Sequence, residues 1–466
     1  MPQLAPTGHT SAPPHDGRAP ARPGAALTVT AAATAVALMN YTAPMLTLPD
    51  TAAAFGTPPS AQAWLLNGTP LGLAVLLLVA GSLADAHGRR RIFLLGTLAL
   101  GLTTALGALA DSTLTFTAAR IAQGAASAAV LAGSLGLLAH AYPAGRDRIR
   151  ATGIWGASVS AGIALGPLLA GALSLADWRL VYGTLGAAAL VIAGAGARAL
   201  RADETKREGS GSRPDIAGAT ALGLALAALL TALTLGRDGW LRPQVGLLLF
   251  AAVALTALFV AVERRSRTPM VDLALLRRPA FLASTLGALF TGLAVIGLFS
   301  VVPALLQGGA GMSPLGAAWL FVLWSGTAFL VALQARRLPA RLSAPYQLAL
   351  GFALSAAGVL ALLGGLEGPT ASWSRLLPGL LVAGAGSGLL NAALPRLAVD
   401  SVPPERAAMG SGANNTARYI GSSAGVALML ALATAGTGPD TAVVVSAALA
   451  VTGAVVTLTL GRRPRR

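Results

Sequence analysis

Two arginines stand inside long apolar runs of this sequence, where a charged side chain is costly. Arg120 lies in the run 113–140 and Arg418 in the run 407–434. If these runs cross a membrane, each arginine costs at least about 2.5–3.5 kcal/mol, so it marks a functional site or a fixed partner. Gln123 follows Arg120 at i+3 and shares its helix face. The structural alternative is an arginine bonded to backbone carbonyls.

Arg418 belongs to a polar face of its expected helix. Asn414 and Asn415 precede it by four and three residues, and Tyr419 follows Asn415 by four. This face would present amides, a guanidinium and a phenol inside the bilayer, a set that can bind a polar solute. The alternative is that the same groups only hydrogen-bond between helices for stability.

A third cluster lies in segment 81–91, where an acidic residue stands among arginines. Asp85 can be ionised and paired there, and Gly88 allows a tight turn between antiparallel helices. A plain basic loop would explain the arginines, but not Asp85 and both glycines at this spacing.

A fourth cluster lies in the run 150–173. Gly162 and Gly166 form a strip that lets two helices approach closely, and Pro167 bends the helix. Ordinary glycine-rich packing is the alternative explanation for this strip.

The elements that must position these residues are membrane spans. The chain has 466 residues, of which 55% are hydrophobic and 11% charged, against about 25% charged in soluble domains. Stretches of roughly 20 apolar residues, enough to cross a bilayer, recur from end to end. We predict an all-α polytopic membrane protein with 14 transmembrane helices. The expected spans are 26–46, 61–83, 91–110, 113–140, 150–173, 179–198, 215–235, 244–262, 280–306, 314–334, 346–365, 375–395, 407–434 and 441–460.

Basic residues indicate the orientation of these spans. Of the 33 Lys and Arg residues, 27 fall on the side that holds the N-terminus, 4 on the other side and 2 within spans, and positive charge marks the cytoplasmic side. An even number of spans places both termini there. The proline-rich residues 1–25 predict a disordered cytoplasmic tail without a signal peptide, and 461–466 predict a basic one.

Several classes of function are disfavoured. The chain has no cysteine and four histidines without metal-ligand spacing, so we expect no metal and no cofactor. No phosphate-binding loop and no nucleophile–base set occurs, and the polar segment 199–214 is too short for a soluble domain. We expect neither an enzyme nor a nucleic-acid-binding protein, because the charges sit in short clusters between spans. The oligomeric state and the substrate's identity stay open.

Segment 81–91 resembles the G-x-L-a-D-r-x-G-r-k/r signature of the major facilitator superfamily, in which this loop acts as a conformational latch between two halves. The resemblance implies a gating loop made of Gly81, Asp85, Gly88, Arg89 and Arg90.

Two further segments resemble motifs of the same family. Arg120, Gln123 and Gly124 look like its R-x-x-q-G motif, in which the arginine faces the central cavity and is implicated in proton transfer. Residues 162–171 look like the antiporter motif g-x-x-x-G-P-x-x-G-G, typical of exporters, with Ala170 in place of a glycine. The implied antiporter residues are Gly162, Gly166, Pro167 and Gly171.

The subgroup is indicated by two more segments. Residues 412–421 resemble the N-x-x-R-q-x-G segment of the fourteen-helix drug:proton antiporters, with Tyr419 where Gln is usual. Residues 269–277 resemble the P-L-x-D-L-x-L-F segment that follows the extra helix pair in that group. The resemblance covers nearly the whole chain. It implies two six-helix halves, 26–198 and 280–460, with two linking helices in 199–279.

One departure bears on coupling. Asn40 stands where many fourteen-helix exporters carry an Asp, and none of the 17 acidic residues lies deep within an expected span. Proton coupling needs an intramembrane group whose pKa can shift. Three interpretations remain: proton exchange at Asp50 or Asp85, coupling through an anionic substrate paired with Arg120 or Arg418, or an uncoupled facilitator. The missing deep carboxylates favour a neutral or anionic amphipathic substrate.

The leading hypothesis is a multidrug exporter of the bacterial cytoplasmic membrane that moves small amphipathic compounds by alternating access, with protons as the expected coupling ion. The alternative is a facilitator or importer of a small organic solute on the same fold. The residues expected along the substrate or proton pathway are Asn40, Tyr41, Arg120, Gln123, Asn391, Asn415, Arg418 and Tyr419.

Overall fold

The computed structural model describes residues 23–59, 61–142, 146–200, 216–236, 239, 241–266, 275, 277–335, 342–368, 372–402, 407–434 and 438–461. Throughout these residues the regular structure is helical. The helices are α1 (Pro23–Thr42), α2 (Pro44–Ala54), α3 (Gln62–His87), α4 (Arg89–Ala108), α5 (Thr113–Ala141), α6 (Arg146–Leu173), α7 (Trp178–Ala199), α8 (Ile216–Leu235), α9 (Pro243–Arg265), α10 (Pro279–Phe290), the π-helix η3 (Thr291–Ile296), α11 (Gly297–Phe299), α12 (Val302–Ala310), α13 (Pro314–Ala335), α14 (Ala344–Leu360), α15 (Trp373–Asp400), α16 (Ala407–Thr434) and α17 (Pro439–Gly461).

The helices account for the expected membrane spans. In the described part of the chain, 11 helices are long and apolar enough to cross a membrane. Shorter apolar helices, Gln62–Leu77, Thr220–Leu233 and Ala344–Leu360, lie in the three remaining expected spans. Large apolar side chains such as Leu106, Phe250 and Val455 are more than half exposed on the outside of the bundle. This surface suits contact with lipid and confirms an all-α polytopic membrane protein.

Some helix boundaries differ from the expected spans. The first span continues beyond residue 46, because Pro44 starts a second helix that runs to Ala54. Proline is favoured at the first helical position, where its missing N–H has no partner to lose. The same preference lets α1 begin at Pro23, inside the segment that we expected to be a disordered tail. Residues 1–22, 201–215, 267–274 and 462–466 lie outside the described residues.

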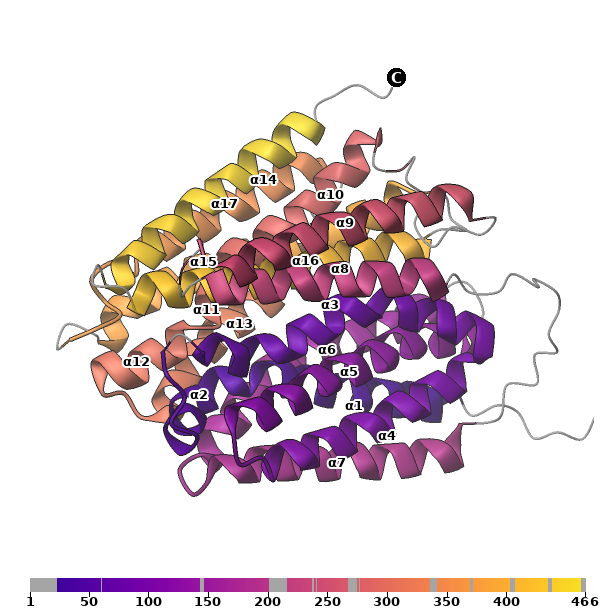
Figure 1. Ribbon diagram of the computed structural model, residues 1–466, viewed down its shortest axis with the longest axis horizontal. Coiled ribbons are helices and arrows are strands. Elements are labelled where there is room, and N and C mark those ends of the chain that lie inside the picture. Colours follow the sequence, from indigo (N-terminus) through magenta and orange to yellow (C-terminus); the bar gives the residue numbers. More distant parts are fainter. Residues whose placement is uncertain are drawn as a thin grey trace, which may run out of the picture.

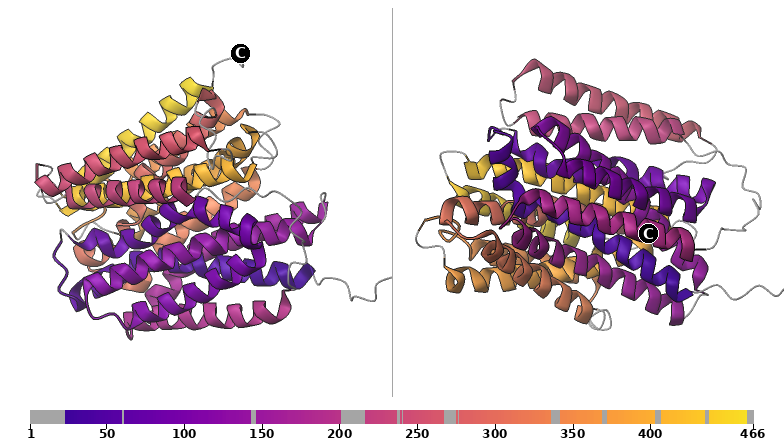
Figure 2. Two further views of the ribbon diagram at one scale, coloured as in Figure 1. Left: turned by 45° about the vertical axis from the view of Figure 1, so that its right-hand side comes forward. Right: turned by 90° about the horizontal axis from the view of Figure 1, so that it is seen from below.

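Figure 1 shows the helices in two groups that follow the sequence, α1–α7 in indigo to magenta and α10–α17 in orange to yellow. The groups meet where α3 contacts α16 and where α6 contacts α13. Helices α8 and α9 pack against each other, and α8 also contacts α3 and α16. Figure 2 shows this pair along one edge of the molecule. The α3–α16 seam is therefore covered by a helix pair.

Close helix packing within the first group depends on glycine. A Cβ atom on Gly72 would collide with the backbone oxygen of Ile121, and one on Gly124 with that of Thr69. The backbones of α3 and α5 therefore touch without intervening side chains, as small residues permit in membrane helices. Because Gly124 is one turn from Arg120, this contact fixes how that arginine is presented to the bundle.

The span Pro279–Ala310 is irregular at its centre. The π-helix η3 interrupts it between α10 and α11, and its Gly292 lies against the backbone of Arg418 in α16. Gly421 and Gly425 of α16 similarly touch Leu293 and Gly297. Short π segments are rare and occur often at functional sites. This one packs directly against the helix that carries Arg418.

The glycine contact gives a prediction about stability. We expect Gly124→Ala to lower the free energy of unfolding by about 1–3 kcal/mol, because the added methyl overpacks the α3–α5 contact. Gly156→Ala is a matched control, because a Cβ at Gly156 meets no atom within 4 Å. The measurement is thermal unfolding of both purified variants in detergent. Equal unfolding temperatures for the two variants would show that the α3–α5 contact is not tight.

Candidate functional site

Arg120 is the largest fully buried side chain among the described residues, with 0% exposure. Its Nη1 donates to the backbone oxygen of Asn40 at 2.8 Å, to Asn40 Oδ1 at 2.6 Å and to Gln123 Oε1 at 2.6 Å. Its Nε and Nη2 have no hydrogen-bond partner among the described residues. The guanidinium is thus held by three neutral acceptors, on one nitrogen only. One of these acceptors is a backbone carbonyl and two are side-chain amides.

The acceptors of Arg120 are themselves fixed by α4. Asn40 donates through Nδ2 to Thr104 Oγ1, and that hydroxyl donates to the Leu100 backbone oxygen at 2.6 Å. Gln123 donates through Nε2 to the Thr103 backbone oxygen at 3.1 Å. The network therefore joins α1, α4 and α5. An amide at position 40 both accepts from the guanidinium and donates to the threonine, which an ionised carboxylate would not do.

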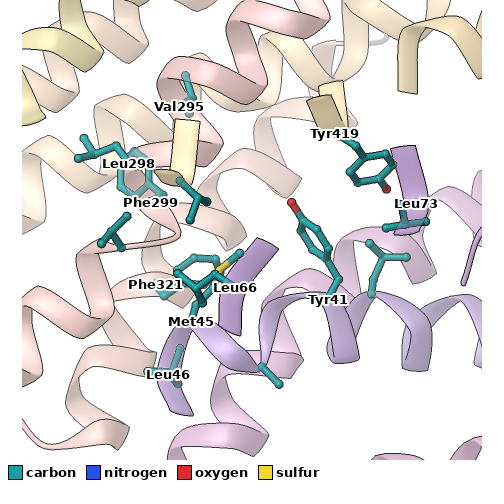
Figure 3. Packing of buried hydrophobic residues seen from close by; sticks show 14 of the residues in the cluster. Tyr41, Met45, Leu46, Leu66, Leu73, Val295, Leu298, Phe299, Phe321 and Tyr419 are labelled. Carbon is teal, nitrogen blue, oxygen red and sulfur yellow. The ribbon is translucent and has the colours of Figure 1, made fainter. Parts of the chain in front are cut away.

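Tyr41 extends this cluster across to the second helix group. Its hydroxyl lies 3.0 Å from Ser422 Oγ, and its ring meets the Tyr419 ring edge-on with 5.8 Å between centroids. Figure 3 shows the two tyrosines side by side, Tyr41 from α1 and Tyr419 from α16. Edge-to-face rings at this distance attract each other. The structure thus brings together residues that are far apart in the sequence.

Arg418 contributes a second guanidinium, which lies beside Tyr419 on α16. Its Nη2 donates to Asn415 Oδ1 at 3.0 Å, and its Cζ lies 5.4 Å from the centre of the Tyr419 ring. The side chain is half-buried. Asn414 instead donates to the hydroxyl and backbone oxygen of Ser284 in α10, at 3.0 and 3.1 Å. Asn414 therefore fastens α16 to α10, and Asn415 and Arg418 form a pair of their own.

Asn391 does not join these residues. It is exposed on α15, and no hydrogen bond from its side chain occurs among the described residues. The sequence prediction placed it in the pathway because it is a polar residue in an apolar run. Its facing on the helix was not readable from the sequence.

The expected gating loop forms a tight turn. Gly88 ends α3 and begins α4 with φ of 96°, in the region that favours glycine. Arg89 Nη1 donates to the Gly136 backbone oxygen at 3.2 Å, and Arg90 Nε donates to that of Leu200 at 2.9 Å. These arginines tie α4 to α5 and to the end of α7. Gly81 has open space where a Cβ would stand. The Asp85 side chain lies outside the described residues.

The glycines of the expected antiporter motif have different neighbours. Cβ atoms on Gly162 and Gly166 would collide with Ala35 and Thr42 in α1. One on Gly171 would stand 2.9 Å from Ala318 Cβ in α13. Helix α6 therefore packs on α1 along most of the motif and reaches the second helix group at its end. Pro167 is buried inside α6.

Sequence reasoning missed several polar residues that link the two helix groups. Asn67 Nδ2 donates to the Ser423 backbone oxygen at 3.1 Å, and Gln307 Nε2 donates to that of Leu46 at 3.1 Å. Asn67 and Gln307 are amides in apolar runs, and this pattern could have marked them as interior polar residues. Their partners were not predictable, because each partner lies in the other helix group and is brought near only by tertiary packing.

A separate cavity of about 530 Å³ lies beside the C-terminal part of α2 and its connection to α3. Both helix groups line it, with Leu48 and Ala52 on one side and Val301 and Leu430 on the other. Neither Arg120 nor Arg418 lines it. No group of three or more His, Asp or Glu side chains that could hold a metal ion occurs in the described part of the chain.

Comparison with known proteins supports a transport role. A multidrug resistance protein, Stp, of Mycobacterium tuberculosis H37Rv is 32% identical over 385 residues, which cover 82% of this chain and 70% of Stp. A puromycin resistance protein of Streptomyces alboniger is 32% identical, and the match covers 88% of this chain and 82% of that protein. A probable actinorhodin transporter of Streptomyces coelicolor is 33% identical, and the match covers 88% of this chain and 72% of that protein.

The fold is also similar to a solved structure, a bacterial homologue of the human lysosomal transporter Spinster in an inward-facing and unoccupied conformation. The TM-score is 0.68 at 16% identity, covering 94% of this chain and 97% of that one. The family model of the Major Facilitator Superfamily matches residues 30–426. Together with the helical bundle and the polar cluster inside it, this match shows that the chain belongs to the Major Facilitator Superfamily of membrane transporters.

Proposed function

We propose that this protein exports small amphipathic compounds across the bacterial cytoplasmic membrane by alternating access. The observation that carries this proposal is the polar cluster shared by the two helix groups. Arg120 is bonded to Asn40, the neighbouring Tyr41 meets Tyr419 of the second group, and Arg418 stacks on the Tyr419 ring. Export agrees with the similarity to a multidrug resistance protein, a puromycin resistance protein and a probable actinorhodin transporter.

Alternating access requires that two halves can separate on either side of the site. We assign these halves to 26–198 and 280–460, joined by the linking helices in 199–279. The links between them include three hydrogen bonds, Tyr41–Ser422, Asn67–Ser423 and Gln307–Leu46. A typical hydrogen bond contributes about 0.5–1.5 kcal/mol net, so a substrate that replaces one or two of them can shift the equilibrium between states.

The distribution of basic residues orients the transporter with both termini in the cytoplasm. The turn at Gly88 then lies on the cytoplasmic side, where Arg89 and Arg90 hold α4 against its neighbours. The hydrogen bonds of Asn67 and Gln307, which link the two helix groups, then lie toward the opposite side of the membrane. This arrangement would present the polar cluster to the cytoplasm, the side from which an exporter collects its substrate.

The driving force has two candidates. Asp50 is half-buried on α2, and its Oδ2 has no hydrogen-bond partner among the described residues. An enclosed carboxyl in a membrane span is a candidate group for proton exchange. The second candidate is the gradient of the substrate itself, as in an uncoupled facilitator. It is favoured because the described acidic residues on helices all stand near helix ends, which leaves no described carboxylate deep in the bundle to carry protons.

Export is tested with three amphipathic dyes of different charge: ethidium, Nile red and fluorescein. We expect cells that express the protein to lose at least one dye faster than cells with an empty vector, measured by fluorescence. Nigericin, which dissipates the pH gradient, should slow that efflux if protons are coupled and leave it unchanged for a facilitator. Equal retention of all three dyes in both cell types would contradict export.

Arg120 gives a second prediction. We expect Arg120→Ala to abolish export and to lower the free energy of unfolding by about 1–3 kcal/mol, because Asn40 and Gln123 lose their buried donor. Arg120→Lys keeps the charge but not the shared geometry of the guanidinium, and we expect export to slow about tenfold while the protein stays folded. Efflux and thermal unfolding are measured on the same variants.

Arg179→Lys is the matched control for this substitution. Arg179 is a half-buried arginine on a helix of the first group, and, like Arg120, it donates to a backbone oxygen, that of Ala110 at 3.1 Å. It lies outside the polar cluster, so we expect wild-type efflux. Wild-type efflux from Arg120→Ala would remove Arg120 from the transport pathway.

A further inference from the structure

The polar cluster carries positive charge that the described residues do not balance. Two guanidinium groups, Arg120 and Arg418, belong to it. The Arg120 guanidinium lies 5.9 Å from the centre of the Tyr182 ring, and no carboxylate is among its hydrogen-bond partners in the described residues. The acidic residues whose side chains are described stand in loops or near helix ends: Asp50, Asp111, Asp147, Asp177, Glu263, Glu367, Asp400 and Asp440.

The hydrogen bonds of Arg120 leave much of its capacity unused. Its three acceptors, on Asn40 and Gln123, are neutral oxygens that meet the same nitrogen. Nε and Nη2 are enclosed without partners among the described residues. Buried charges are normally paired, because an unpaired charge costs much of its solvation energy. An enclosed arginine without a carboxylate therefore favours any state in which an anion comes near.

Arg418 is the more accessible of the two groups. It is half-buried, and its hydrogen bond to Asn415 uses one of its donors. Its Nε is enclosed without a partner in the described structure. A guanidinium offers a planar fork that binds carboxylate-like groups with two parallel hydrogen bonds. Asn415, a neutral acceptor, is the group that an incoming anion would replace.

Aromatic rings lie beside both arginines, with Arg120 Cζ 5.9 Å from the Tyr182 ring centre and Arg418 Cζ 5.4 Å from that of Tyr419. Tyr41 directly follows Asn40, which accepts hydrogen bonds from Arg120. Its ring meets that of Tyr419, on which Arg418 also stacks. The rings of Tyr41 and Tyr419 can pack against the flat apolar body of a bound compound, and their hydroxyls can hydrogen-bond to its polar edge. The cluster thus combines positive charge with aromatic surface.

We propose that the exported compound is an organic anion with an aromatic or other flat apolar body, bound through its anionic group at Arg418 in the field of Arg120, and that the membrane potential drives its exit. This inference rests on the proposed function and specifies its substrate class and driving force. The potential of a bacterial cell is negative inside, so it pushes an anion outward. Such an exporter needs no proton-coupling carboxylate inside the bundle, which accounts for Asn40.

The test uses purified protein in liposomes and two dyes with the same xanthene frame, anionic fluorescein and cationic rhodamine 123. A potassium gradient with valinomycin sets the membrane potential. We expect fluorescein to enter protein-containing vesicles when the inside is positive and not when it is negative. An imposed pH gradient at zero potential should add little. Vesicles without protein measure the passive leak.

Variants identify the binding group. We expect Arg418→Gln to reduce fluorescein flux at least tenfold and to weaken fluorescein binding, measured by fluorescence polarisation, by a similar factor, about 1.4 kcal/mol. Arg418→Lys keeps the charge and should retain more flux than Arg418→Gln. Arg179→Gln is the matched control, because Arg179 is also half-buried and stacks on its neighbour, with Cζ 4.4 Å from the Trp178 ring centre. We expect it to behave as wild type.

The outcomes separate this inference from the proposed function. Flux of rhodamine 123 without fluorescein would overturn the anionic substrate and leave export standing. Fluorescein flux that follows the pH gradient and ignores the potential would overturn the driving force. No flux of either dye through folded protein would count against both proposals. Equal loss of fluorescein flux in Arg418→Gln and Arg179→Gln would remove Arg418 as the binding group.

Discussion

The structure is organised around a charged side chain that is held inside a membrane protein by neutral acceptors. Arg120 is fully buried with no carboxylate among its described hydrogen-bond partners, so its position depends on the carbonyl oxygens of Asn40 and Gln123. Those amides are held in turn by Thr103 and Thr104 of α4. Three helices must therefore keep their register for the guanidinium to stay solvated by the protein. This constraint explains the close packing of the surrounding backbone.

Glycine makes this packing achievable without a hydrophobic driving force between helices. The α3–α5 contact through Gly72 and Gly124 lies beside Arg120. The α1–α6 contact through Gly162 and Gly166 holds the helix that carries Asn40. In lipid, helix association depends on van der Waals contact and hydrogen bonds, both of which improve as backbones approach. The residues that resemble family motifs are thus also the residues that shape the site.

The two helix groups are linked by single hydrogen bonds as well as by helix contacts. Tyr41 and Asn67 meet serines of α16, and α6 touches α13 at Gly171. Each of these hydrogen bonds can be exchanged at modest cost. A transporter that alternates between two states needs a stable interior in each half and a weak interface between them. The polar cluster sits at that interface, where a bound compound can alter the balance.

The linear pattern of residues was enough to predict the membrane class, the approximate spans, the family and the unusual residues Arg120, Asn40 and Arg418. Hydrophobic length and the cost of a buried charge act locally, so they are visible in a linear pattern. Which polar groups meet is set by the tertiary structure. It paired Tyr41 with Ser422, turned Asn414 toward Ser284 and left Asn391 exposed. Such contacts depend on how each helix is rotated about its axis. That rotation is set by packing against neighbours that are distant in the chain.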